Sequence, residues 1–361
     1  MITVWKNIGV LRGAAIICVV LNHATLAQRV VHESWAGGAL PYTALERVII
    51  TLGCTIPVAA IAGFMVAAGY LAGRFSSTWP AARASVRSLL GRYVAWSILG
   101  FLALGLLRRR FDMEFMASRM AAFFGPFPAY WFFVSLILFS LLAPALTALA
   151  KRHPLVLLAL FVMTEGLRAI LFYSGVPVSN LLTPLQGSYF VLGVLLSQHS
   201  NAVVAQLVPH RTLVLIAAVL MLGLACLETT YFWDVAGFPD GNTISADRTA
   251  LRVYAVLITT WFLLRETRQS IVSTWLDKIG MRSLAIFLSF DFLQWCVFSF
   301  LWHLSERPLG STGSGFEAPP SLMRNPAWIA VYFGVGLLGP LAAVAALERL
   351  AGKRWRQFVF G

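Results

Sequence analysis

The chain has 361 residues, of which 59% are hydrophobic and only 12% are charged. This composition is too apolar for a water-soluble globular domain and predicts a polytopic membrane protein in contact with lipid. The net charge of +13 would suggest nucleic-acid binding in a soluble protein, but basic loops beside membrane helices account for it here, and no basic patch interleaved with aromatic residues points to nucleic acid.

Ten apolar segments are long enough to cross a membrane as helices. They cover residues 8–28, 48–72, 86–107, 129–149, 154–174, 183–198, 211–229, 247–264, 280–303 and 326–348. No gap between them is long enough for a second folded domain. We therefore expect an all-α bundle of about ten transmembrane helices, forming a single membrane domain over residues 1–361.

The first segment carries two polar residues, Arg12 and His23, within an apolar run. A separation of eleven residues places both side chains on one helix face, roughly 16 Å apart along the axis. Ionisable groups inside a membrane are costly and mark functional sites, and a histidine is suited to general-base chemistry. The alternative is an arginine that reaches the headgroups and a histidine satisfied by a neighbouring helix.

The second segment is rich in small residues between Ala62 and Gly73, which favours close helix packing. Arg83, Arg87 and Arg92 follow it, and the first two are i,i+4 neighbours on one helix face. Guanidinium groups bind phosphate through paired hydrogen bonds. We therefore expect an anion site here, with ordinary positive-inside residues as the alternative.

The distribution of basic residues predicts the orientation. If the N-terminus is cytoplasmic, 17 of the 28 Lys and Arg residues lie on that side, so both termini are expected in the cytoplasm. The cluster Arg108–Arg110 falls on the opposite side. Either this cluster binds an anion outside or the third segment is misassigned, so its role stays open.

Three acidic residues in or beside apolar segments are further site candidates. Glu165 is three residues before Arg168, and the two could neutralise each other. Asp291 lies in the middle of the ninth segment, where either a distant arginine or a functional role would explain it. Glu348 closes the tenth segment and is either an interfacial residue or a ligand for a core arginine.

Familiar soluble-enzyme motifs are absent from the sequence. The four cysteines lie in apolar runs without metal-ligand spacing, so we expect no metal centre. No histidine is followed five residues later by an aspartate, and no GxSxG, Walker A or HExxH motif occurs.

Six stretches occur in an order typical of one family. They are LRGAAIICVVLNHA, PVAAIAGFMVAAGYL with the arginines after it, AYWFFVSLILFSLLAPAL, SYFVLGVLLS, KIGMRSLAIFLSFDFL and ALERL. Together they resemble the acyltransferase 3 family of bacterial membrane acyltransferases over nearly the whole chain.

The resemblance implies transfer of an acyl group, commonly acetyl, from a cytoplasmic acyl-CoA such as acetyl-CoA. The implied acceptor is a hydroxyl of a cell-surface glycan or its lipid-linked precursor, and the implied location is the bacterial inner membrane. Arg12 and His23 match the arginine and histidine of the first-helix motif, with His23 as the base. Arg87 and Arg92 are the favoured matches to the family's arginine pair.

The sequence also departs from the family pattern. Ala62 replaces the usual serine of the second-helix motif, and Phe290 stands where the ninth segment often has histidine. The chain has no SGNH hydrolase-like domain, so it resembles the stand-alone type. Two other functions stay open: a transporter or flippase for a lipid-linked or anionic substrate, and an inactive acyltransferase-like partner.

Overall fold

The computed structural model describes residues 4–35, 44–108, 113–114, 116–117, 131–174, 187–234, 248–265, 270–304 and 327–359. The regular structure of these residues is helical, without a strand. The predicted all-α membrane bundle is therefore confirmed.

The described residues form a series of mostly long helices. In chain order the elements are α1 (Val4–Trp35), α2 (Ala44–Thr55), the 3-10 turn η1 (Ile56–Val58), α3 (Ala59–Phe75), α4 (Trp79–Arg108), α6 (Trp131–Arg152), α7 (Pro154–Tyr173), α9 (Ser188–Leu207), η3 (Val208–His210), α10 (Arg211–Asp234), α11 (Thr249–Leu264), α12 (Ile271–Met281), α13 (Ser283–Leu304) and α14 (Ala327–Val359).

Each of the ten predicted segments coincides with a helix, with two differences. The second segment is broken into α2 and α3 at η1, where Pro57 lacks the amide hydrogen that a continuous helix needs. The short helix α12 was not predicted, because eleven residues cannot span a bilayer and the search was for spanning length.

Six stretches of the described residues are long and apolar enough to cross a membrane. They lie in α1, across the break from α2 into α3, in α6, in α7, along α9 and α10, and in α14, while α11 and α13 contain shorter apolar runs. Within the described chain, α4 is not among these stretches.

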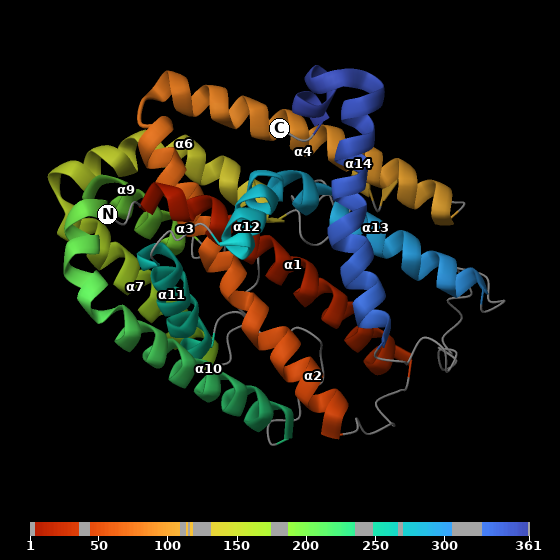
Figure 1. Ribbon diagram of the computed structural model, residues 1–361, viewed down its shortest axis with the longest axis horizontal. Coiled ribbons are helices and arrows are strands. Elements are labelled where there is room, and N and C mark those ends of the chain that lie inside the picture. Colours follow the sequence, from red (N-terminus) through yellow and green to blue (C-terminus); the bar gives the residue numbers. More distant parts are fainter. Residues whose placement is uncertain are drawn as a thin grey trace.

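Helix α1 occupies the middle of the bundle. It contacts α3, α11, α12, α13 and α14, and Figure 1 shows it running through the centre of the view, where α12 and α14 overlap it. Several of its apolar side chains are buried, and those of Ile16 and Val20 are fully so. Polar groups on α1 are therefore held inside the protein by several neighbouring helices.

The small residues of α3 allow a close contact with α9, as the sequence predicted. A Cβ atom at Gly69 would overlap the carbonyl oxygen of Phe190, and one at Gly193 would overlap the carbonyl oxygen of Val66. Only glycine lets two helix backbones approach this closely.

Candidate active site

Arg12 and His23 are both carried by the uninterrupted helix α1. Each is only partly exposed, although the residues beside them on α1 are largely buried. The continuous helix keeps them on one face, at the separation of about three turns that the sequence predicted.

The imidazole of His23 faces a carboxylate. Its Nδ1 lies 3.2 Å from Oδ1 of Asp291 on α13. The side chain of His23 is 25% exposed and that of Asp291 is 9% exposed. The histidine is therefore accessible to a substrate, whereas the aspartate is enclosed by the protein. The partner of Asp291, which the sequence left open, is a histidine rather than an arginine.

Phe290, next to Asp291, forms an apolar wall against the same ring. It is fully buried, and its ring meets that of His23 edge to face with centroids 4.9 Å apart. Such edge-to-face contacts stabilise ring orientation. The residue that departs from the family pattern therefore packs against His23 without contributing a proton donor or acceptor.

A glutamine one turn further along α13 ties this helix to its neighbours. Gln294 donates to the backbone carbonyl of Val20 on α1 at 3.3 Å and to that of Tyr332 on α14 at 3.2 Å. Both bonds are buried, where each satisfies a polar group that would otherwise be costly. They fix α13 against α1 within one turn of His23.

Arg12 is held at the other end of the same face. Its guanidinium donates to Oγ of Ser283 at 2.9 Å and interacts electrostatically with the carboxylate of Asp277 on α12. Neither Ser283 nor Asp277 was predicted as a site residue from the sequence. A signal was present, because Gly280 and Ser283 lie in the stretch KIGMRSL that resembles a family motif.

Glycines bring α12 close enough to α1 for these contacts. A Cβ at Gly13 would overlap the carbonyl oxygen of Leu276, and one at Gly280 would overlap the carbonyl oxygen of Gly9. The two backbones therefore touch directly, which places Asp277 beside the first turns of α1.

The three arginines of the predicted anion site lie on α4. Arg83 and Arg87 are exposed, whereas Arg92 is half-buried. Among the described contacts, no hydrogen bond or ion pair joins them to Arg12 or His23. Helix α4 does contact α13 and α14, the helices that pack against α1. Their role in donor binding stays a prediction.

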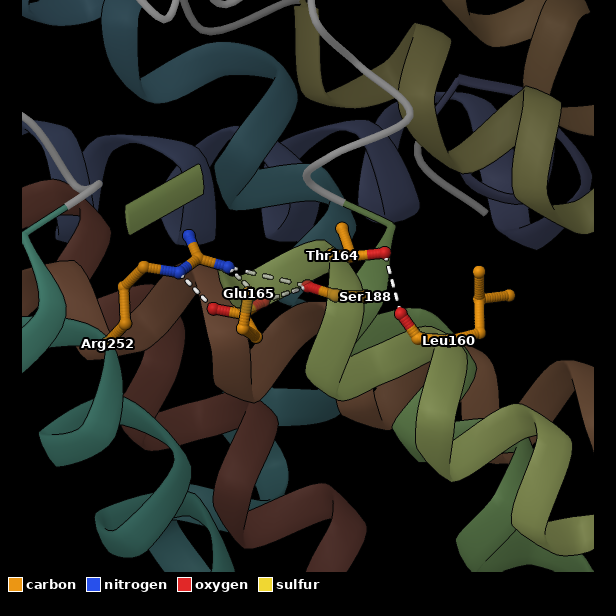
Figure 2. A network of polar contacts seen from close by, with 5 residues as sticks. All are labelled: Leu160, Thr164, Glu165, Ser188 and Arg252. Carbon is orange, nitrogen blue, oxygen red and sulfur yellow. Dashed lines mark hydrogen bonds and ion pairs between the residues drawn. The ribbon is translucent and has the colours of Figure 1, made fainter. Parts of the chain in front are cut away.

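Glu165 belongs to a separate polar network, shown in Figure 2. Its carboxylate accepts hydrogen bonds from two nitrogens of Arg252 on α11 and from Oγ of Ser188 on α9. Arg252 also stacks over the ring of Tyr189, 4.7 Å from its centroid. The idea that Arg168 simply neutralises Glu165 is therefore incomplete: the hydrogen-bonded partner is Arg252, because packing brings α11 against this part of the bundle.

This network of hydrogen bonds has a structural role, because it holds helices together. It joins the helices α7, α9 and α11, and the side chain of Arg252 is buried. Arg168 is fully buried nearby and is electrostatically coupled to both Glu165 and Arg252.

The remaining candidates have no described place at the His23 site. Glu348 is half-buried on α14, next to the exposed Arg349. Arg109 and Arg110 lie outside the described residues, as does the side chain of Arg108 at the end of α4. Within the described chain, no group of three or more His, Cys, Asp or Glu side chains is arranged to hold a metal ion.

Comparison with known proteins identifies the family. The model of one family, described as an acyltransferase domain, matches residues 5–345. No curated protein and no solved structure matches the chain. The family match includes α1, with Arg12 and His23, and α13, with Asp291. The chain therefore belongs to this acyltransferase family and is a membrane acyltransferase.

Proposed function

We propose that the protein transfers an acyl group, acetyl above all, from acyl-CoA to a hydroxyl of a cell-surface glycan or lipid-linked glycan precursor, with His23 as the general base. The observation that carries the proposal is the contact between His23 and Asp291 inside a helical acyltransferase. A histidine whose Nδ1 faces a carboxylate has Nε2 available to accept a proton. A quarter of the His23 side chain is exposed, which would give an acceptor access to the ring.

The proposed reaction is a direct acyl transfer. Nε2 of His23 takes the proton of the acceptor hydroxyl as the hydroxyl oxygen attacks the thioester carbonyl carbon. A carbon–oxygen ester bond forms and the carbon–sulfur bond breaks, with the electron pair leaving on the sulfur of CoA. The proton then passes from His23 to the CoA thiolate, which restores the neutral imidazole.

Arginines support binding of the donor at the other end of α1. Arg12 lies about three helical turns from His23, or roughly 16 Å along the axis, a distance that an extended pantetheine arm can cover. Arg83, Arg87 and Arg92 on α4 would hold the phosphates, because guanidinium groups bind phosphate through paired hydrogen bonds. Acyl-CoA is thus the donor that best fits the face of α1 that carries both an anion-binding arginine, Arg12, and a base, His23.

The proposal includes an orientation in the bacterial inner membrane. With both termini cytoplasmic, Arg12 and the arginines of α4 lie near the face at which acyl-CoA is available. A reporter fused after Gly361 should then report the cytoplasm, and one inserted between Ser305 and Asn325 should report the outside. An external C-terminus would contradict this topology and the donor site that depends on it.

The decisive experiment measures release of CoA from labelled acetyl-CoA by the purified protein in detergent. His23→Ala should abolish transfer while leaving expression and thermal unfolding close to those of the unaltered protein. His210→Ala is the matched control, because His210 is exposed in η3, away from the site, and this variant should remain active. Full activity in His23→Ala would refute the assignment of the base.

A further inference from the structure

Asp291 is a buried carboxylate whose two oxygens have different surroundings. Oδ1 lies 3.2 Å from Nδ1 of His23. Oδ2 is buried and has no hydrogen-bond partner among the described residues. Burying a carboxylate is costly unless it is paired. Asp291 therefore depends on His23 for its described polar contact.

We propose that Asp291 is the positioning residue of the active site, which holds His23 in the tautomer that has its proton on Nδ1 and its lone pair on Nε2. This inference rests on the proposed function of His23 as the base. An ionised carboxylate can only accept hydrogen bonds, so a hydrogen between Oδ1 and Nδ1 belongs to Nδ1. A neutral imidazole has one N–H, so Nε2 is left as the acceptor.

The same contact assists the reaction after the proton has moved. When Nε2 takes the proton from the acceptor hydroxyl, the ring becomes an imidazolium cation, and the negative charge of Asp291 stabilises it. Asp291 does not itself take up a proton: the hydrogen on Nδ1 stays there, and the proton on Nε2 continues to the CoA thiolate. Asp291 thus acts through His23 and touches neither substrate.

Neighbouring groups give the pair its fixed geometry. The ring of Phe290 packs edge to face with that of His23, but it has no hydrogen-bonding group with which to select a tautomer. Gln294 donates a hydrogen bond to the backbone carbonyl of Val20, which holds α13, the helix of Asp291, against α1, the helix of His23. Phe290 and Gln294 therefore position the His23 ring and helix α13, and Asp291 selects the tautomer of His23.

The test replaces Asp291 with asparagine, which keeps the size of the side chain and removes its charge. The amide nitrogen of Asn can donate to Nδ1 and so favours the other tautomer. We expect Asp291→Asn to lower kcat by on the order of 10²–10⁴-fold, as loss of tautomer control does in catalytic triads, with little change in the KM for acetyl-CoA. Ser289→Ala is the control: it removes a buried hydrogen bond to Ala285 within the same helix, and kcat should stay within about twofold, the usual effect of a change that leaves the reacting groups in place.

A second readout does not depend on activity. Protein labelled with ¹⁵N-histidine should show His23 with its proton on Nδ1, the resonance being assigned by its loss in His23→Ala. Asp291→Asn should shift the signal toward the other tautomer, and Asp291→Glu, which keeps the carboxylate, should preserve the signal and recover part of kcat. If Asp291→Asn does not fold, the tautomer of His23 in the unaltered protein decides: a proton on Nε2 instead of Nδ1 would overturn the positioning role.

The outcomes separate this inference from the proposed function. Unchanged kcat in Asp291→Asn, or a lower kcat with an unchanged tautomer, would overturn the positioning role. A fully active His23→Ala protein would instead overturn the assignment of the base, whatever the tautomer shows. Reduced kcat together with a changed tautomer supports both.

Discussion

Replacing Glu165 should destabilise the protein without altering its chemistry. In Glu165→Ala, the guanidinium of Arg252 loses the carboxylate that accepts two of its hydrogen bonds, and Ser188 loses the same acceptor. Removing one partner of a buried ion pair typically destabilises a protein by about 3–5 kcal/mol. The side chain of Glu165 is 20% exposed, so we expect a value near the lower end, about 3 kcal/mol, or roughly a 150-fold change in the unfolding equilibrium.

The assay compares unfolding in detergent with the rate of CoA release per folded molecule. The double variant Glu165→Gln with Arg252→Met should recover much of the lost stability, because it removes both charges and leaves a side chain of similar length over Tyr189. The activity of each folded variant should match that of the unaltered protein. A large fall in kcat with unchanged stability would refute the structural reading and return Glu165 to the list of catalytic candidates.

Two further predictions concern helix packing and donor binding. Gly69→Ala should destabilise the protein by about 1–3 kcal/mol, because the new Cβ overlaps the backbone of α9. In Gly166→Ala the new Cβ meets nothing within 4 Å, so this variant should be neutral or stabilising by roughly 0.5–1 kcal/mol. Unfolding measured for both variants side by side checks this prediction, and equal effects would contradict the close α3–α9 contact. Arg87→Lys and Arg92→Lys should weaken acyl-CoA binding by about 1–3 kcal/mol despite the conserved charge, while Arg108→Lys should leave it unchanged. Calorimetry on the three variants decides this, and sensitivity at Arg108 alone would mean that the donor site or the topology is wrong.

The helices themselves follow from the sequence, since hydrophobicity and helix periodicity are local properties. In lipid, a backbone must satisfy its polar groups within the segment, so an apolar run of sufficient length becomes a helix. The same regularity fixed Arg12 and His23 on one face of α1, and the order of the motifs was enough to indicate the family, which the family match over residues 5–345 confirms.

Which polar groups meet was decided only by the tertiary structure. His23 pairs with Asp291 on α13, and Glu165 pairs with Arg252 on α11 rather than simply with its near neighbour Arg168. Sequence spacing describes contacts within one helix, whereas contacts between helices depend on how their surfaces pack. Helix α12 shows the same limit: it is too short for a hydropathy criterion of spanning length, yet its glycine contact with α1 brings Asp277 to Arg12.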